Sequence, residues 1–408
     1  MFRVLLLNLC MFNTFVYAGG FDSSGRPFDI IFGDDNALEI SVFYLKPSVT
    51  LDVSRNIGDG SSLPSTAMDK IVDAYAEPRF AIRLKVSDQV NCASQIEQPF
   101  RFKTTYQDDA LSYQSDNNQA SSQVAAPINS EYSSESISIA CSISYGITHD
   151  SVMFKQSFFS FIAGPKLQRI DGSFSSDLSN QNMGSRDNYI ATLNGSTEWG
   201  YLFGLAYEIP EIAFRASLFF HNEIHHDLTG HVQAPLPDFS NVVSQAVEAK
   251  TITPKAINFR LQSGIAKDWL AFMELRWGDW SSLDEMQVEA GNLSSRLVLF
   301  ENDTLNYKIG LGVKMNERLS LGGYFESVVD LNPPITPKGI DGTNLRNPQA
   351  DRYSLAFGGK YLLVKNLSLA LGGSYYYIEK GRFSDSSYTV DLNSSDAIAF
   401  GGTLTYLY

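Results

Sequence analysis

Six basic residues lie on the polar side of alternating apolar and polar segments, where their side chains would point into an enclosed interior. They are Arg83, Arg215, Arg260, Arg276, Lys308 and Arg352. A guanidinium or ammonium group in such a position can bind a carboxylate through a charge-assisted hydrogen bond. For any one of them, an ion pair with another interior side chain is the simpler interpretation, so the six are candidates as a group.

The segment HNEIHHDLTGH (221–231) holds three residues that could bind a metal ion or act in hydrolysis. His221, Glu223 and His225 alternate, so on a strand they would share one face. Zinc proteases instead place two histidines four residues apart on a helix, with a glutamate after the first. No serine–histidine pair stands out either. We therefore predict no enzymatic activity, no cofactor and no metal site, and keep a hydrolase as the less favoured alternative.

A proline interrupts the segment QIEQPFRFKTTY (95–106), which otherwise alternates like a strand. Proline lacks the N–H that a strand paired on both sides must donate, so Pro99 requires a bulge or a gap there. In a closed barrel no edge is available to accommodate it. Pro99, with Phe100 and Phe102 beside it, is the candidate for an opening in the wall. The alternative is a proline at the end of a strand.

The elements that position these residues are β-strands with one apolar and one polar face. In TLNYKIGLGVKM (304–315) every second residue is apolar, and the same alternation recurs in SISIACSISYGI (136–147), DWLAFMELRW (268–277), RYSLAFGGKY (352–361) and LSLALGGSYYY (367–377). Successive side chains of a strand point to opposite faces. Strands of about 10–13 residues suit a tilted membrane crossing. The repetition predicts an all-β fold, a transmembrane β-barrel.

The two ends of the chain and its charge agree with this class. Met1 to Ala18 has one arginine, an apolar run and small residues before Gly19, which indicates a secretory signal peptide. The terminal TLTYLY, with an aromatic last residue, resembles the signal read by the barrel assembly machinery. A formal net charge of −14 argues against nucleic acid as a partner. Export would permit a disulfide between Cys92 and Cys141, but two separate small apolar residues are the favoured interpretation.

Tight turns and long polar segments alternate along the chain. Six turns fall at 88–89, 148–150, 209–211, 267–268, 316–317 and 364–366, and seven longer segments fall near 54–77, 107–130, 173–196, 227–254, 281–302, 331–350 and 381–394. These connections join 14 antiparallel strands, with both chain ends on the side of the tight turns. In a bacterial outer membrane that side is the periplasm.

A barrel of this size is wide enough to need a plug if small solutes are to be kept out. Residues 19–37 precede the first strand and are apolar without regular alternation, which favours folding into the lumen over a disordered periplasmic leader. We predict a signal peptide at 1–18, a short N-terminal hatch at 19–37 and the barrel at 38–408. The apolar hatch residues that would meet a ligand are Phe21, Pro27, Phe28, Ile30, Ile31 and Phe32.

The chain resembles the FadL-type family of outer-membrane transporters for long-chain fatty acids and other hydrophobic compounds. The resemblance rests on Gly19-Gly20-Phe21 and on the successive hairpins at 200–220, 253–282 and 351–378. It implies a 14-stranded barrel plugged by an N-terminal hatch, with ligand captured outside, passed to an interior pocket and released sideways at a kinked third strand. Many members carry an Asn-Pro-Ala motif in the hatch, where this chain has Asn36-Ala37-Leu38 in a shorter segment. The chain is therefore similar to a divergent branch whose ligand and hatch movement can differ.

The extracellular capture site is predicted in FSNVVSQAVEAK (239–250). Phe239, Val242, Val243 and Val247 fall at helical spacing within a long polar segment. A short amphipathic helix there could offer an apolar landing surface for ligand, or could cap the barrel mouth by packing on neighbouring loops.

These expectations combine into passive uptake of a hydrophobic small molecule, most simply a long-chain fatty acid, across a bacterial outer membrane. The predicted partners are that ligand, the lipid and lipopolysaccharide around the barrel, and the assembly machinery during biogenesis, with the barrel itself a monomer. A general or substrate-selective porin is the alternative transport function. Steady, large channels in a planar bilayer would indicate the porin.

Overall fold

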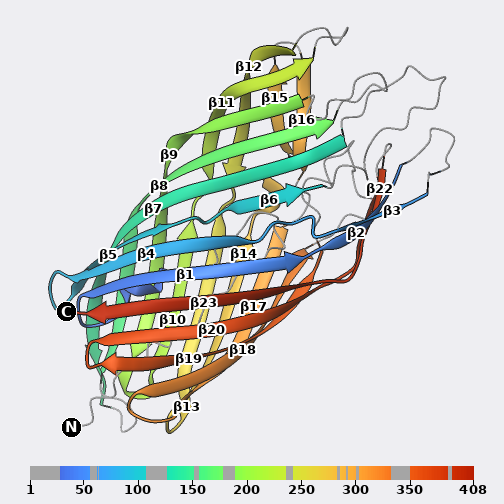
Figure 1. Ribbon diagram of the computed structural model, residues 1–408. Helices are drawn as coiled ribbons and strands as arrows, with labels where there is room; N and C mark the ends of the chain where they lie inside the picture. Colours follow the sequence, from blue (N-terminus) through green and yellow to red (C-terminus); the bar gives the residue numbers. More distant parts are fainter. Residues whose placement is uncertain are drawn as a thin grey trace.

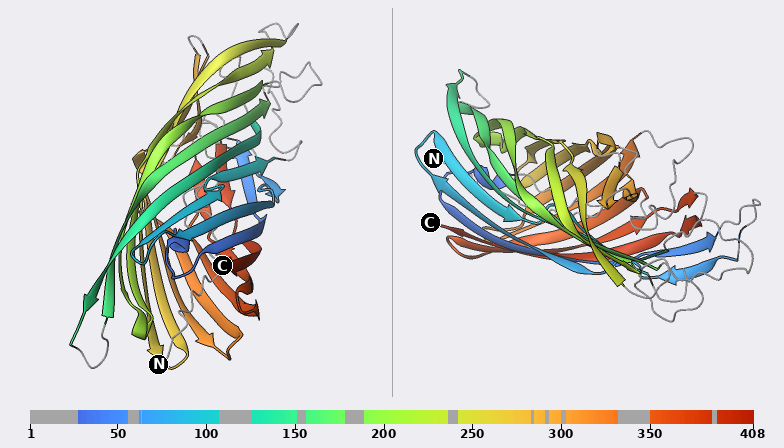
Figure 2. Two further views of the ribbon diagram at one scale, coloured as in Figure 1. Left: turned by 90° about the vertical axis from the view of Figure 1, so that its left-hand side faces the viewer. Right: turned by 90° about the horizontal axis from the view of Figure 1, so that it is seen from above.

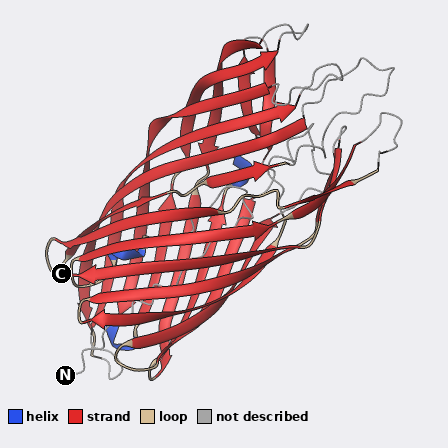
Figure 3. Ribbon diagram, in the orientation of Figure 1, coloured by secondary structure: helices blue, strands red, loops and turns tan. Residues whose placement is uncertain are grey.

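The computed structural model describes residues 28–55, 62, 64–106, 126–150, 156–177, 189–235, 242–282, 285–290, 293–299, 303–331, 350–384 and 388–408. Most of this part of the chain is β-strand (Figure 3). Three single-turn 3-10 helices accompany the strands, η1 (Asp29–Ile31), η2 (Pro210–Ile212) and η3 (Trp280–Ser282). Among the described residues, no helix has the length and apolar character needed to span a membrane.

Nineteen strand elements form one antiparallel sheet that closes on itself, because β1 pairs with β4 on one side and with β23 on the other (Figure 1). The elements are β1 (Ala37–Ser48), β4 (Tyr75–Lys85), β5 (Val90–Glu97), β6 (Arg101–Thr105), β7 (Ala126–Thr148), β8 (Gln156–Asp177), β9 (Tyr189–Ile209), β10 (Phe214–His221), β11 (Ile224–Pro235), β12 (Val242–Thr253), β13 (Ala256–Ala266), β14 (Trp269–Gly278), β15 (Glu285–Ala290), β16 (Leu293–Leu299), β17 (Asp303–Lys314), β18 (Leu319–Leu331), β19 (Arg352–Val364), β20 (Leu367–Ile378) and β23 (Ser395–Leu407). The pairs β5/β6, β10/β11, β12/β13, β14/β15 and β16/β17 are each two halves of one interrupted strand. The described chain is therefore a closed barrel of 14 strands, and the predicted fold is confirmed.

The alternation in the sequence becomes an apolar outer surface and a polar inner one. On β17, Ile309 and Leu311 point outward and are 57% and 48% exposed. Lys308, directly before Ile309, points inward and is 2% exposed. The same contrast holds on β19, where Phe357 points outward and Arg352 and Ser354 are buried. Period-2 patterning thus fixes which side chains face the lumen.

Several strands are longer than the sequence indicates. β7, β8 and β9 contain 23, 22 and 21 residues. With β11, β12, β15 and β16 they make one side of the wall extend farther than the other (Figure 2). The segments predicted as loops at 173–196 and 227–254 are therefore largely strand where the structure describes them. Alternating polar residues such as serine and threonine carry no apolar signal, but they still form a strand when neighbours on both sides supply hydrogen bonds.

The predicted helix at 239–250 is wrong, because this segment contributes to β12. Residues 242–253 pair with β11 along their whole length and with β15 at 248–250. Burial alternates from Val247 onward, with Val247, Ala249 and Thr251 buried and the residues between them exposed. β-Branched residues pack well on a pleated surface, and here they outweigh the helical spacing of the first few valines. Phe239 lies outside the described residues.

A second, small sheet stands at the end of the barrel away from the chain ends. It consists of β2 (Thr50–Arg55), β3 (Thr66–Asp69), β21 (Gly381–Ser384) and β22 (Tyr388–Leu392). Its core is apolar, with Leu51, Val53, Met68 and Val390 buried. The connections from β1 to β4 and from β20 to β23 are thereby folded against each other.

Cys92 and Cys141 form a disulfide, so the prediction of two separate cysteines is wrong. The two residues are direct partners in the register of β5 and β7, with Cα atoms 4.0 Å apart. The sequence places Cys141 correctly in an outward-facing series, but it does not reveal which residue lies opposite. The disulfide ties β5 to β7 on the outer face of the wall.

Candidate ligand path

The third barrel strand is interrupted where the sequence places Pro99. β5 ends at Glu97 and β6 begins at Arg101 (Figure 1). On the β7 side, residues 98–100 face only Ser134 and Glu135, since Glu97 pairs with Ser136 and Arg101 with Ser133. The extra residue makes this a bulge, so odd-numbered residues face inward before the interruption and even-numbered ones after it. The predicted bulge or gap is present.

Ser134 of β7 holds the far side of the interruption in place. Its Oγ accepts a hydrogen bond from the Phe100 amide at 2.8 Å and donates one to the Phe100 carbonyl at 3.1 Å. Its amide donates to the same carbonyl at 2.8 Å. The wall between β7 and the third strand therefore stays joined.

The wall on the other side, between β4 and the third strand, loses its ladder. The β4–β5 register ends at Phe80 and Ile96, and pairing resumes only as the isolated bridge between Val72 and Thr104. Residues 75–79 of β4 pair with β1 but have no register with β6 in the described structure. Five residues of a strand span about 16 Å. We call this stretch the wall break.

A second proline and an arginine mark the wall break. Pro78 lies in the middle of β4, opposite Val42 of β1, and its missing N–H is tolerated in a strand that lacks a ladder on one side. Arg101 of β6 reaches across, donating from Nη1 to the carbonyl oxygen of Ala76 at 3.3 Å. Its guanidinium also lies 5.7 Å from the centre of the Tyr75 ring. Neither residue is in the predicted site, although a proline inside an alternating segment is the same signal that identified Pro99.

An upper apolar cluster lines the lumen beside the wall break. Its buried members are Phe100, Phe102, Tyr132, Ile170, Phe174, Ala191, Leu193, Leu228, Val232, Val247, Ala249 and Trp280. The rings of Phe100 and Trp280 meet edge to face with centroids 5.9 Å apart. The structure thus brings together residues predicted for two separate sites, because Phe100 and Phe102 share this cluster with Val247. The side chains of Val242 and Val243 are not described.

A lower apolar cluster fills the lumen near the chain ends, where the N-terminal segment 28–36 packs. It contains Phe28, Ile30, Ile31, Phe32, Ala37, Ala81, Ala93, Ala140, Ile162, Leu202, Ala206 and Phe219. Four of the predicted hatch residues are therefore buried among residues of seven different barrel strands. Phe21 and Pro27 lie outside the described residues.

Polar side chains separate the two clusters. On β8, Lys166 and Gln168 lie between Ile162 of the lower cluster and Ile170 of the upper one. Neighbouring strands repeat this order, and buried polar residues between the clusters include Gln95, Glu97, Ser134, Ser136, Ser138, Lys166, Gln168, His226, Thr251 and Thr253. A hydrocarbon moving down the lumen would have to bury against polar groups, which is unfavourable.

Three of the six predicted carboxylate partners bind the N-terminal segment. Arg83 donates from Nε to the Asp35 carbonyl at 2.7 Å and from Nη1 to the carbonyls of Ile30 and Phe32. Arg260 forms an ion pair with Asp29. Arg215 lies 4.3 Å from the centre of the Phe32 ring and pairs with Glu208 at 2.8 Å.

The other three predicted partners lie higher in the lumen. Arg276 donates to Asn258 Oδ1 at 2.9 Å, and Lys308 lies 3.7 Å from Glu326. Arg352 is equally buried, yet its Nε and Nη1 have no hydrogen-bond partner within the described structure. All six cations thus face the lumen, but their surroundings differ.

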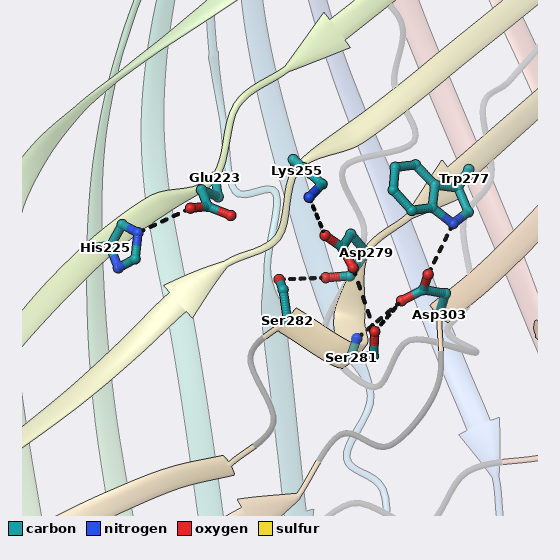
Figure 4. A network of polar contacts seen from close by, with 8 residues as sticks. All are labelled: Glu223, His225, Lys255, Trp277, Asp279, Ser281, Ser282 and Asp303. Atoms are coloured by element: carbon teal, nitrogen blue, oxygen red, sulfur yellow. Dashed lines mark hydrogen bonds and ion pairs between the residues drawn. The ribbon is translucent and has the colours of Figure 1, made fainter. Parts of the chain in front are cut away.

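The interruptions on the opposite side of the barrel are bridged by polar contacts (Figure 4). Lys255, between β12 and β13, lies 2.6 Å from Asp279 after β14. Asp303 of β17 accepts hydrogen bonds from Ser281 Oγ at 2.8 Å and from Trp277 Nε1 at 3.2 Å. Charged and hydroxyl groups would have to be separated to open this side.

The histidine-rich segment does not form the predicted shared face. The strand is interrupted at 222–223, so His221 ends β10 while His225 lies on β11, and the inward-facing positions change from odd to even numbers between them. His225 Nε2 lies 3.2 Å from Glu223, and both side chains are exposed to solvent. No group of three or more His, Cys, Asp or Glu residues that could hold a metal ion occurs in the described part of the chain.

Comparison with known proteins shows relatives among transport proteins. The family model described as outer membrane protein transport protein (OMPP1/FadL/TodX) matches residues 27–407. The long-chain fatty acid transport protein of Escherichia coli O6:H1 is 21% identical over 295 residues, which is 64% of this chain and 64% of that protein. The protein of the same name from Salmonella typhi is 22% identical over 245 residues, 54% of this chain and 52% of that one. Each match thus spans less than two thirds of the relative.

Solved structures share the fold along nearly the whole chain. A Pseudomonas aeruginosa FadL homologue has a TM-score of 0.69 at 14% identity, covering 95% of this chain and 97% of that one. The toluene transporter TbuX of Ralstonia pickettii has a TM-score of 0.59 at 12% identity, covering 93% and 91% of the two chains. Because the family model covers nearly all of the sequence, this chain belongs to the OMPP1/FadL/TodX family of outer membrane transport proteins, as a β-barrel of the bacterial outer membrane.

Proposed function

We propose that this barrel takes up long-chain fatty acids, or other hydrophobic small molecules, and releases them sideways into the membrane through the wall break. The observation that carries the proposal is the loss of the β4–β6 ladder directly beside the upper apolar cluster. Phe100 and Phe102 connect the two, since they follow Pro99 and are buried in that cluster. Family membership supports a hydrophobic cargo.

The physical driving force is the removal of hydrocarbon from water. Burying a methylene group contributes about 0.8 kcal/mol, so a long acyl chain is drawn from dilute solution into an apolar lumen without any other energy source. Phe80 and Ile96, at the lower end of the wall break, face outward and are 39% and 49% exposed. A ligand leaving there would meet the hydrocarbon of the bilayer.

The N-terminal segment has the contacts expected of a plug. In this proposal residues 19–37 form the hatch, held near the periplasmic end by Arg83, Arg215 and Arg260. The plug keeps polar solutes out while the ligand leaves above it. The barrel acts as a monomer within lipid and lipopolysaccharide.

Two measurements, one in cells and one on the purified protein, test the transport function. Cells that produce the barrel should accumulate radiolabelled palmitate faster than cells that lack it, with no change for a polar sugar of similar mass. In planar bilayers the reconstituted barrel should show no steady, large conductance. Palmitate uptake equal to that of cells without the barrel would exclude this function. A permanently open channel would indicate a porin instead.

Lateral exit is tested separately at Pro99. Replacing Pro99 with valine restores the N–H, so the third strand can pair more fully and narrow the wall break. Palmitate uptake should fall severalfold while the heat-modifiable, folded form of the barrel persists on gels. Undiminished uptake by a folded Pro99→Val barrel would count against sideways release.

A further inference from the structure

Arg352 is the buried cation of the lumen whose surroundings call for a ligand. Its side chain is 4% exposed, and its Nε and Nη1 are fully buried without hydrogen-bond partners in the described structure. A buried guanidinium without such partners is strongly unfavourable, and an unsatisfied buried group of this kind usually has an ion or ligand to bind. The contrast with Arg83 is direct, because Arg83 is equally buried and donates to three carbonyl oxygens.

The nearby acidic group is already shared. The groups that act electrostatically on Arg352 are Glu326, Tyr376, Tyr75 and Asp330. Glu326 lies 3.7 Å from Lys308 Nζ and accepts hydrogen bonds from Asn306 Nδ2 at 2.8 Å and Ser354 Oγ at 3.3 Å. Asp330 is only half-buried, so water screens its charge. Arg352 therefore shares the buried carboxylate of Glu326 with Lys308, and a bound carboxylate would bring it a negative charge of its own.

An apolar track leads from Arg352 to the wall break. The track consists of Tyr376 on β20, Ala397 and Ala399 on β23, Phe43 and Leu45 on β1, and Tyr75 on β4, all buried in one cluster. β19, β20, β23, β1 and β4 are consecutive strands of the wall. With strands about 4.8 Å apart, the distance across the wall from Arg352 on β19 to Tyr75 on β4 is about 19 Å. Its far end, Tyr75, borders the wall break beneath Arg101.

We infer that Arg352 binds the carboxylate of an acyl-chain ligand whose hydrocarbon lies along this track, so that the barrel selects long-chain acids over uncharged hydrocarbons. A carboxylate bound at Arg352 would accept hydrogen bonds from its Nε and Nη1 groups. The length of the track suits a long acyl chain rather than a single aromatic ring. The inference rests on the proposed function, because the ligand must first enter the lumen. The positive charge of Arg352 would distinguish this barrel from a channel that carries only uncharged hydrocarbons.

The test compares two ligands of equal chain length, palmitate and hexadecanol, on the purified full-length barrel at neutral pH. The wild-type barrel should bind palmitate more tightly than hexadecanol. Arg352→Gln should weaken palmitate binding about 10- to 100-fold, the range for losing a charge-assisted hydrogen bond, and leave hexadecanol binding within about twofold. Arg352→Lys, which keeps the charge, should retain most of the palmitate affinity.

Two controls separate this role from a structural one. Arg169→Gln removes an exposed arginine that pairs with Asp171 on the outer side of β8, and it should change neither ligand's binding. Thermal stability of the ligand-free barrel should not fall in Arg352→Gln, since an unsatisfied buried charge is lost, whereas Arg276→Gln removes a bonded one and should destabilise.

Each contrary result has a distinct meaning. Equal losses of palmitate and hexadecanol binding in Arg352→Gln, or no loss of either, would overturn the carboxylate site. Equal affinity of the wild-type barrel for both ligands would do the same while leaving hydrophobic transport intact. Binding of neither ligand by the wild-type barrel would overturn the proposed function itself.

Discussion

Arg101 of β6 and Ala76 of β4 are joined across the interrupted wall by a hydrogen bond of 3.3 Å from the guanidinium to the backbone oxygen. Strands such as β17 and β18 are joined by a continuous ladder, which opens only at high cost. Here the flexible Arg101 side chain spans the gap, and its guanidinium also lies over the Tyr75 ring. This contact can be undone without unfolding a strand.

Arg101→Ala should therefore increase palmitate uptake. A hydrogen bond of this kind contributes about 1 kcal/mol, which corresponds to about a fivefold shift of the equilibrium toward the open wall. The initial uptake rate in cells with equal amounts of folded barrel measures the change. Arg169→Ala, an exposed arginine on β8, is the matched control and should leave the rate unchanged. An Arg101→Ala rate at or below that of the control would show that this contact does not limit exit.

The N-terminal segment should loosen when Arg83 is removed. Arg83→Ala loses hydrogen bonds to the carbonyls of Ile30, Phe32 and Asp35, together about 3 kcal/mol or more. Hydrogen exchange at the amides of residues 30–35 should accelerate by about 100-fold or more. Gly33→Ala should act in the same direction, because Gly33 has φ of 134° and an added Cβ would strike the Arg83 guanidinium. Unchanged exchange in both variants would contradict the anchoring role.

The disulfide between Cys92 and Cys141 should stabilise the wall next to the wall break. It closes a loop across 49 residues of sequence and so restricts the unfolded chain, which typically contributes about 2–4 kcal/mol. The Cys92→Ser/Cys141→Ser barrel should unfold at lower urea concentration than the wild type. Adding reductant should bring the wild type to the same midpoint and leave the double variant where it is. Identical midpoints under oxidising conditions would mean that the β5–β7 ladder alone determines stability here.

The barrel itself could be predicted because its signal is local and repeated. Alternation such as that in 304–315 specifies a strand and its two faces residue by residue, and proline has a chemical effect that can be derived without a structure. Pro99 is predicted on that ground. Pro78 carries the same chemical signal, but its place beside the interrupted third strand depends on the pairing of β4 with its neighbours.

What escaped prediction depends on contacts between distant residues. Cys92 and Cys141 meet through the β5–β7 register, which the sequence of either strand does not contain. The valines at 242–247 fit a helix as well as a strand until β11 and β15 are known to lie on both sides. Arg83 and Arg352 are equivalent in the sequence, two inward cations on alternating strands. Contacts with the N-terminal segment make the first an anchor, whereas Nε and Nη1 of the second have no hydrogen-bond partner among the described residues.

Cross-linking the two edges of the wall break tests lateral exit most directly. In a Cys92→Ser/Cys141→Ser background, Ala76→Cys with Arg101→Cys would be joined by a short thiol-specific linker, and palmitate uptake measured before and after linking. Phe80→Cys with Ile96→Cys, partners in the intact ladder just below, provides the matched control. Sideways release predicts that linking 76 to 101 abolishes most uptake and that linking 80 to 96 leaves it unchanged. Full uptake through a folded barrel linked at 76 and 101 would show that the ligand leaves by another route.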